Sequence, residues 1–412
     1  MIFIIFVETK KVLILGIDGY LGWALALRLG KKGHEVYGMD NLITRTQAME
    51  VGGDSAFPLP SVEERRNIFK RYIGPIDFVI NDITKPNVLR DYINKVKPDA
   101  IVHFAEQRSA PYSMIDEDHA IYTMHNNIEG TMRLIYAVKD HPEIHILKMG
   151  TMGEYGTPNY DIPESPYVKF EYKGKSDMIP VPKFAGSWYH WSKVHDSHNL
   201  LFANKVWGIT VTDINQGPVY GTRTTDMMDG ENVIEGLRTR IDIDEAWGTV
   251  VNRNAVRAIL GLPLLVYGKG GQTRGFISLE DSVNALEILI NNPPKEGEFR
   301  VVNQFMELYS VEKIAMLIAN ATEELFGYRP KIHYVRNPRV EMEEHYYNPE
   351  RKILPSLGYE QKRFLKDEIY SILTDLYQYR DRLKNFSEWT NVKTDWRNGR
   401  NDKNRFDLIK EL

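Results

Sequence analysis

The chain lacks cysteine, a strong net charge and any long hydrophobic run. Without cysteine among its 412 residues, disulfides, thiolate metal sites and a cysteine nucleophile are excluded, and we expect no metal site. The same absence fits a reducing cytoplasm, where we place the protein. A formal net charge of −4 gives no basic surface for nucleic acid. The apolar residues 1–7 are far fewer than the ~20 that span a bilayer, and they lack the features of a signal peptide, so we expect no membrane partner.

A glycine-spaced turn near the N-terminus is the first functional signal. The apolar residues 12–15 lead into Gly16-Ile17-Asp18-Gly19-Tyr20-Leu21-Gly22, and a helical pattern follows. Glycines at this spacing let the backbone approach a pyrophosphate, which then rests on the helix N-terminus. A second apolar segment ends at Asp40, whose carboxylate would bind both ribose hydroxyls and repel a 2′-phosphate. The pattern predicts NAD rather than NADP, with Arg45 as the one nearby residue that could weaken this preference.

Strand and helix patterns alternate along the chain. Apolar strands are predicted at 77–80, 100–104, 144–149 and 210–214, and helices at 127–139 and 188–203. Such alternation predicts an α/β protein with a doubly wound parallel sheet, a Rossmann fold, and a smaller α/β substrate lobe. We divide the chain into an extension at 1–10, a cofactor domain at 11–214 with an insert at 44–75, and a lobe at 215–412 in which 279–305 return to the core. Within 44–75, Ser61 to Glu64 form a capping box that should begin a helix ending near Tyr72. Beyond a helix at 366–383 we expect a surface tail.

The carboxyl ends of parallel strands converge on one edge of such a sheet, and this is where the cofactor should bind. Asp82 and Ile83 follow the predicted strand 77–80, where an adenine is expected. The residues predicted to contact the cofactor are Gly16, Asp18, Gly19, Tyr20, Leu21, Gly22, Asp40, Asn41, Arg45, Asp82, Ile83, Phe104, Ala105, Glu106, Asn126, Tyr189 and Lys193.

Tyr189 and Lys193 stand four positions apart, on one face of a predicted helix. A free tyrosine titrates near pH ~10, and a neighbouring ammonium together with a cationic nicotinamide would lower that pKa enough for a general base. The pair alone is a weak signal, because this spacing is common by chance. The glycine turn and a threonine-bearing turn at Thr151 strengthen it, so we predict catalytic roles for Thr151, Tyr189 and Lys193.

Five motifs in order resemble the nucleotide-sugar branch of the extended short-chain dehydrogenase/reductase superfamily. They are the glycine turn, the Thr151–Tyr189–Lys193 set, Asn127-Ile128-Glu129-Gly130 at a helix start, Asn215-Gln216-Gly217-Pro218-Val219-Tyr220-Gly221, and Val266 to Arg274. The segments from His103 to Met114, Gly150 to Gly156 and Gly268 to Gly275, with Tyr189-His190, further resemble the UDP-sulfoquinovose synthase family. That likeness runs from about Lys11 to Arg397. It implies UDP-glucose and sulfite as substrates and NAD that is reduced and reoxidised within one turnover, and we expect a homodimer.

Related activities can be tested against the turn at Thr151. Sugar-nucleotide 4,6-dehydratases carry an Asp and a Glu where this chain has Met152 and Gly153, neither of which transfers a proton. A dehydratase is therefore disfavoured, whereas a UDP-hexose 4-epimerase needs no such pair and stays open. A non-enzymatic NAD sensor is a second alternative, although it would not need a proton-transfer set.

The resemblance implies a role for each site residue. Thr151 and Tyr189 would hold the glucose 4-hydroxyl, and Lys193 would lower the pKa of Tyr189. His190 and Glu154 are the candidates for moving the protons at C5 and C6, and Arg108 and His190 for holding sulfite beside Gly153. The alternatives are a packed helix residue for His190 and a phosphate contact to NAD for Arg108. The predicted substrate contacts are Gln107, Arg108, Thr151, Asn215, Gln272, Arg274 and Arg339.

Overall fold

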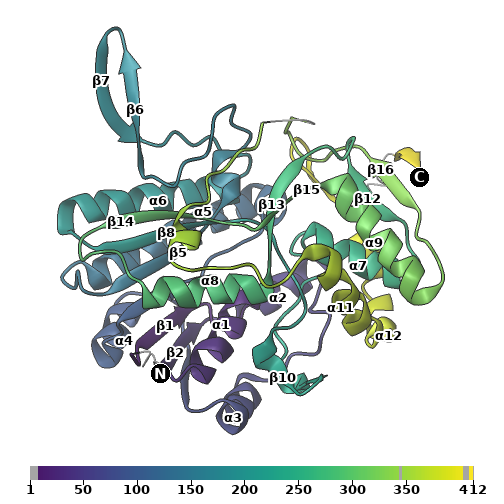
Figure 1. The fold of residues 1–412 in the computed structure, drawn as a ribbon, viewed down its shortest axis with the longest axis horizontal. Helices are drawn as coiled ribbons and strands as arrows, with labels where there is room; N and C mark the ends of the chain where they lie inside the picture. Colours follow the sequence, from purple (N-terminus) through teal and green to yellow (C-terminus); the bar gives the residue numbers. More distant parts are fainter. Residues whose placement is uncertain (1–7, 343–345, 402–407, 412) are drawn as a thin grey trace, which may run out of the picture.

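A seven-stranded parallel sheet forms the centre of the computed structural model, which describes residues 8–342, 346–401 and 408–411 (Figure 1). The strand order is β14-β8-β5-β4-β1-β2-β3, and each neighbouring pair is parallel. This order confirms the predicted doubly wound sheet. The strands are β1 (Lys11–Leu15), β2 (Glu35–Asp40), β3 (Ile76–Ile80), β4 (Ala100–His103), β5 (His145–Thr151), β8 (Thr210–Gln216) and β14 (Phe299–Gln304). Residues 1–7 of the predicted extension lie outside the described residues.

Helices cover both faces of the sheet, because alternate side chains of each strand point to opposite faces. Val12 and Ile14 of β1 pack with the helices of one face, whereas Leu13 and Leu15 pack with those of the other. The first face carries α1 (Tyr20–Lys31), α3 (Val62–Tyr72) and α8 (Leu279–Asn291), and the second carries α4 (Val88–Val96), α5 (Glu117–Val138) and α6 (Trp188–Trp207). With α8 and β14, the chain returns from the lobe to the sheet.

Two helix starts show what capping decides. Helix α3 begins with the predicted capping box, in which Ser61 and Glu64 each bond the other's backbone N–H. Helix α5 begins at Glu117, because the Asp116 side chain accepts a hydrogen bond from the His119 N–H. The prediction of a helix start at Asn127 is therefore wrong, and that residue lies buried within α5.

A smaller lobe stands over the carboxyl edge of the sheet (Figure 1). A three-stranded sheet packs there with three helices around a second apolar core. Its elements are β12 (Leu264–Tyr267), β16 (Ile332–Val335), β19 (Leu408–Glu411), α7 (Val250–Ile259), α9 (Val311–Phe326) and α11 (Leu365–Tyr377). A second sheet, made of β9 (Val219–Tyr220), β13 (Thr273–Ser278) and β15 (Glu307–Ser310), lies between this lobe and the main sheet.

Two segments depart from the expected outline. A hairpin of β6 (Tyr167–Tyr172) and β7 (Lys175–Pro180) projects from the body just before α6 (Figure 1). After α12 (Arg380–Lys384), residues 387–400 do not form a surface tail, because Thr390, Thr394 and Asp395 are buried against the rest of the protein. Within the described ranges, no helix combines the length and the apolar character that crossing a bilayer requires.

Candidate active site

A cavity of about 840 Å³ lies between the carboxyl edge of the main sheet and the lobe. All seventeen residues predicted to contact the cofactor line this cavity, and so do Thr151 and His190. Of the predicted substrate residues, Arg108, Gln272, Arg274 and Arg339 also face the cavity. The structure thus brings together segments from the glycine turn at one end of the chain to residue 396 at the other.

The glycine turn is shaped to approach a ligand closely. Gly16 has φ +87°, and a Cβ there would stand 2.8 Å from the Phe104 carbonyl carbon. A Cβ on Gly22 would stand 2.2 Å from the Gly16 oxygen, so both positions require glycine. Helix α1 then starts without a side-chain cap, which leaves its first N–H groups open to a phosphate. This arrangement fits the pyrophosphate of a dinucleotide.

Asp40 ends β2 beside this turn. Its carboxylate accepts hydrogen bonds from the Asp18 N–H at 2.9 Å and the Leu42 N–H at 2.7 Å. Burial and the nearby Asp18 raise the pKa of Asp40 to about 6. Arg45 donates to both oxygens of Asp18, at 2.7 and 2.8 Å, and Arg65 adds a third contact at 2.9 Å. Arg45 is therefore bound to the glycine turn and is not held for a 2′-phosphate.

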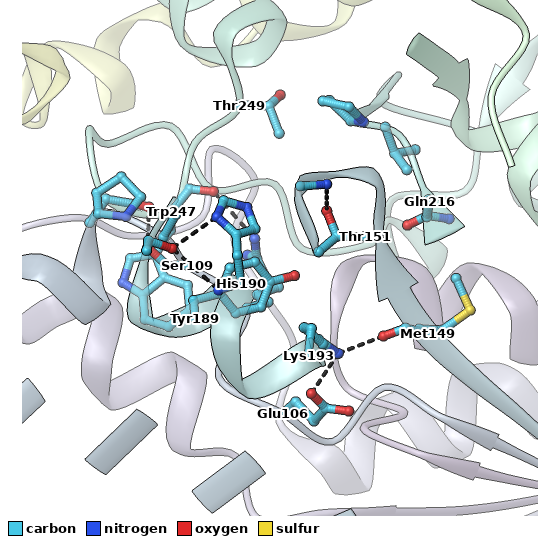
Figure 2. A pocket seen from close by; sticks show the side chains of 18 of the residues that line it. Glu106, Ser109, Met149, Thr151, Tyr189, His190, Lys193, Gln216, Trp247 and Thr249 are labelled. Atoms are coloured by element: carbon cyan, nitrogen blue, oxygen red, sulfur yellow. Dashed lines mark hydrogen bonds and ion pairs between the residues drawn. The ribbon is translucent and has the colours of Figure 1, made fainter. Parts of the chain in front are cut away.

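Thr151, Tyr189 and Lys193 surround one part of the cavity, as Figure 2 shows. Thr151 ends β5 and accepts a hydrogen bond from the Gly153 N–H at 3.1 Å. Tyr189 lies in the first turn of α6, and its N–H donates to the Ser113 hydroxyl at 3.1 Å. The Lys193 ammonium stands 5.9 Å from the centre of the Tyr189 ring. The helical spacing therefore brings the two side chains together, as predicted.

Lys193 is held by two partners that line the cavity with it. Its ammonium lies 2.5 Å from Glu106 Oε2 and donates to the Met149 carbonyl at 2.5 Å (Figure 2). Burial, followed by the Glu106 charge, raises the pKa of the Tyr189 phenol above its usual value. The protein by itself therefore keeps Tyr189 protonated, and a lower pKa requires further positive charge in the cavity.

His190 reaches the cavity from the same turn as Tyr189, with its ring 4.9 Å from the tyrosine ring. Its Nδ1 lies 2.9 Å from the Ser187 hydroxyl. Burial and two nearby guanidiniums, Arg339 and Arg274, lower the pKa of His190 to about 3, so it is neutral at pH 7. A Cβ on Gly153 would stand 2.4 Å from His190 Nε2. The space that Gly153 leaves is therefore filled by this imidazole.

Glu154 does not line the cavity. It lies fully buried behind the catalytic turn, bound by Lys148 at 2.9 Å and Lys183 at 2.5 Å. Burial alone would raise the pKa of Glu154, but the two lysines hold it down to about 2. The carboxylate also accepts a hydrogen bond from the Thr151 N–H at 3.2 Å. Its contacts are those of a group that fixes the turn carrying Thr151.

Arg108 lines the cavity beside the lobe segment 240–249. One Nη forms an ion pair with Asp242, the other donates to the Trp247 carbonyl at 3.3 Å, and the guanidinium lies 5.3 Å from the Trp247 ring centre. Arg240 shares the same Asp242 carboxylate at 2.6 Å. Two guanidiniums therefore share one carboxylate, at a wall that also carries the acidic residues Asp244 and Glu245.

The strand end at β8 places its residues differently from the prediction. Asn215 is buried beneath the cavity, where its amide donates to Asn303 at 3.1 Å, while the next residue, Gln216, lines the wall. Adjacent strand residues face opposite sides, so only one of the two can reach the ligand. Gln107 also points inward and donates to the Thr123 hydroxyl at 2.7 Å.

Several lining residues were missed by the sequence reasoning. Among them, the buried polar atoms Trp247 Nε1, Thr249 Oγ1 and Arg253 Nε have no hydrogen-bond partner among the described residues, as expected for groups that serve a polar ligand. Trp396 closes the same end. Its indole N–H donates to the Gly186 carbonyl at 2.6 Å, and Arg339 lies 5.3 Å from its ring. None of these residues stands in a recognisable motif.

Comparisons with known proteins agree with this geometry. Residues 12–303 match the model of the NAD dependent epimerase/dehydratase family, which confirms NAD as the cofactor. The UDP-sulfoquinovose synthase of Sulfolobus acidocaldarius is 60% identical over 94% of this chain and 98% of its own length. The chloroplastic UDP-sulfoquinovose synthase of Spinacia oleracea is 46% identical over 91% of this chain and 77% of its own length.

Solved structures share the fold. A UDP-glucose 4-epimerase from Bifidobacterium longum, in complex with NAD⁺ and UDP, superposes with a TM-score of 0.68. It is 18% identical and covers 91% of this chain and 99% of its own. The chain thus shares the fold of this epimerase, and its sequence identity to the two synthases identifies its family more narrowly. The chain belongs to the NAD dependent epimerase/dehydratase family and, within it, to the UDP-sulfoquinovose synthase family.

Proposed function

We propose that this protein converts UDP-glucose and sulfite into UDP-sulfoquinovose with NAD as a bound cofactor. The observation that carries the proposal is the 60% identity over nearly the whole chain to a UDP-sulfoquinovose synthase, joined to a cavity lined by Thr151, Tyr189 and Lys193. The 4-epimerase alternative is supported only by likeness of fold, at 18% identity. The sensor alternative is not favoured, because the relatives of this chain are enzymes and because Thr151, Tyr189 and Lys193 line one cavity.

The chain's own residues account for the chemistry at C4. Thr151 and Tyr189 hold the glucose 4-hydroxyl, and Tyr189 takes its proton as general base. NAD, which the glycine turn and Asp40 would hold, would supply the acceptor for the C4 hydride and the source for its return. The 4-ketone makes the C5 proton acidic, so that loss of that proton and of the C6 hydroxyl as water leaves an enone. Sulfite adds at C6 of this enone, and C5 regains a proton. Tyr189 then gives its proton back to the C4 oxygen.

Proton transfer at C5 and C6 is assigned to His190 rather than to Glu154. His190 faces the cavity as a neutral imidazole, whereas the Glu154 carboxylate is enclosed by Lys148 and Lys183. An anionic substrate bound beside His190 and its two neighbouring arginines would raise this lowered pKa toward the range in which an imidazole transfers protons. We give Glu154 the role of fixing the Thr151 turn through its hydrogen bond to the Thr151 N–H.

Sulfite would bind between Arg108 and His190. The Arg108 guanidinium would attract an anion, and the His190 ring would supply a neutral donor beside it. The diphosphate and uracil would lie toward Gln272, Arg274 and Arg339, where guanidiniums line the lobe side of the cavity. We assign to Gln216 the substrate contact predicted for Asn215, because Gln216 faces the cavity and Asn215 does not.

A homodimer is proposed from the exposed faces of α5 and α6. Ile121 and Tyr136 on α5, and Phe202 and Val206 on α6, expose between 46% and 63% of their surface. Such a patch on two packed helices fits a second copy of the chain. We further propose a cytoplasmic location, which the cysteine-free sequence supports.

One experiment separates the candidate reactions. The NAD-loaded protein is incubated with UDP-glucose, with and without sulfite, and the products are identified by mass spectrometry. We expect a sulfonated UDP-sugar only when sulfite is present. UDP-galactose formed from UDP-glucose alone, with no sulfonate, would contradict the proposal and support the epimerase.

A further inference from the structure

Glu106 and Lys193 form an ion pair beneath the catalytic tyrosine. Glu106 follows β4 at the carboxyl edge of the sheet, and its Oε2 lies 2.5 Å from Lys193 Nζ (Figure 2). The two side chains expose only 1% and 4% of their surface. Lys193 also donates to the Met149 carbonyl. Since an ammonium has three donors, these two contacts leave one for a ligand in the cavity.

The buried charges around this pair balance only if one carboxyl group is protonated. Seven ionisable residues are enclosed together: Glu106, Glu154, Asp196, Asp213, Lys148, Lys183 and Lys193. Asp196 is fully buried, with Thr131 as its hydrogen-bonding neighbour, and no ion pair joins it to a lysine or arginine among the described residues. Burial, followed by the charge of Glu106, raises the pKa of Asp196 well above its usual value. Burial thus favours the protonated form of Asp196, and with Asp196 protonated three carboxylates face three ammoniums.

The two remaining acids and the other two lysines already pair with each other. Glu154 binds Lys148 and Lys183, and Asp213 lies 3.2 Å from Lys148 and 3.9 Å from Lys183. Glu106 is consequently the counterion of Lys193. A buried ammonium without such a partner would be strongly disfavoured.

We propose that Glu106 is a positioning residue that holds the Lys193 ammonium in place and cancels its charge, so that Tyr189 ionises only when an oxidised nicotinamide adds positive charge beside it. The proposal rests on the roles proposed above for Tyr189 and Lys193. It differs from the role expected from the sequence, in which Glu106 contacts the cofactor itself.

The electrostatics of the site supports this role. An anion close to a phenol disfavours its ionisation, and Glu106 is the strongest charge that raises the pKa of Tyr189. A lysine neutralised by a carboxylate cannot by itself produce a resting phenolate. The tyrosine must take a proton while the cofactor is oxidised and return it once the cofactor is reduced. Once the Lys193 charge is cancelled, the proton affinity of Tyr189 depends on the charge of the nicotinamide.

Other titratable and charged groups face the pair from each neighbouring element. His103 lies 3.4 Å from Glu106, and burial lowers its pKa to about 4, so it is neutral at pH 7. The charges that also act on Tyr189 are Glu154, Lys148 and Arg108. The variants below leave all of these groups unchanged.

The test measures the ionisation of Tyr189 without any substrate. The ultraviolet absorbance of ionised tyrosine is titrated in the NAD-loaded protein, and the same titration of a Tyr189→Phe background is subtracted. In Glu106→Gln, which keeps the shape and an acceptor for Lys193, the titration midpoint should fall by about one pH unit or more, because one charge is removed from close range. Asp196→Asn is the matched control. It replaces a carboxyl group whose neutral form burial favours, and it should leave the midpoint in place.

A charge cycle completes the design. Lys193→Met should raise the midpoint, and Lys193→Met with Glu106→Gln should bring it back down. If the Glu106→Gln single variant does not fold, the effect of the Glu106 charge is measured by comparing the double variant, Lys193→Met with Glu106→Gln, with Lys193→Met alone. A midpoint that stays or rises when Glu106 is neutralised would overturn the proposal, as would an equal fall in Asp196→Asn. Because no sugar or sulfite is present, this result is independent of which reaction the enzyme performs.

Discussion

Trp396 gives the sharpest test of how the C-terminal segment contributes to the active site. Its indole N–H donates to the Gly186 carbonyl at 2.6 Å, just before α6, and the Arg339 guanidinium lies 5.3 Å from its ring. The side chain thus joins the cofactor domain to the arginine proposed to hold the diphosphate. Trp396→Ala removes both contacts, whereas Trp396→Phe keeps a ring and removes only the hydrogen bond.

The expected losses follow from these contacts. A hydrogen bond is worth about 1 kcal/mol and an exposed cation–π contact about 0.5–1 kcal/mol. Trp396→Ala should therefore weaken UDP binding by about 2 kcal/mol, or roughly thirtyfold, and Trp396→Phe by about fivefold. Isothermal titration of the NAD-loaded protein with UDP measures both values directly.

A neighbouring tryptophan supplies the control. Trp389 belongs to the same segment but packs against Gly52, away from the cavity. Trp389→Phe should lower the thermal midpoint of unfolding and leave UDP affinity unchanged. If Trp396→Ala bound UDP within twofold of the unaltered protein, the reasoning that couples this segment to Arg339 would be refuted.

Four further predictions follow from the site. Tyr189→Phe should bind UDP-glucose within a fewfold of the unaltered protein yet lose about 10²–10⁴ in turnover, and a variant that kept a tenth of the rate would require another base. Arg108→Ala and His190→Ala should raise the Michaelis constant for sulfite roughly ten- to a hundredfold and that for UDP-glucose far less, since a charged hydrogen bond is worth ~1.5–3 kcal/mol. Unchanged sulfite kinetics in both variants would move the sulfite site elsewhere. Heat-denatured protein purified without added cofactor should release NAD, whereas release of NADP would contradict the role given to Asp40. Burial lowers the pKa of His103 to about 4 and of His145 and His190 to about 3, so the unfolded chain binds more protons between those values and ~6.5. Asp40 and Asp244, whose pKa values burial raises to about 6 and about 7, act in the opposite direction, so the histidine effect is isolated with His145→Gln. The free energy of unfolding should fall more from pH 7 to pH 5 in the unaltered protein than in this variant, and equal changes in the two proteins would contradict this.

The sequence was most informative where local geometry decides the outcome. Glycines at Gly16 and Gly22 are needed because backbone atoms stand within 3 Å of any added Cβ. Tyr189 and Lys193 meet because residues four apart share a helix face. The parallel sheet was predicted from the alternation of strand and helix patterns. Each pattern is local, because the spacing of its apolar residues reflects the repeat of a single strand or helix. These features depend on near neighbours in the chain.

Some residues at the edge of the site could be assigned only from the tertiary structure, although strand alternation and helix capping are local effects. Strand alternation sends Asn215 into the sheet and Gln216 into the cavity, but the sequence does not fix which of two adjacent residues faces the ligand. The start of α5 depends on which polar residue caps it, and Asp116 does so well before Asn127. A motif alone cannot choose between such options.

Electrostatics and enclosure were decided by tertiary structure alone. Glu154 is held by lysines from β5 and from the loop before α6, Lys193 by a glutamate that follows β4, and the cavity end by Trp396. Whether a carboxyl group is a proton donor, a counterion or a structural anchor depends on burial and on partners far apart in the sequence. The sequence by itself determined the glycine turn and the helical spacing of Tyr189 and Lys193, the residues proposed to react. The folded chain determined the charge that each of them carries, because only folding brings distant ions together and removes them from water.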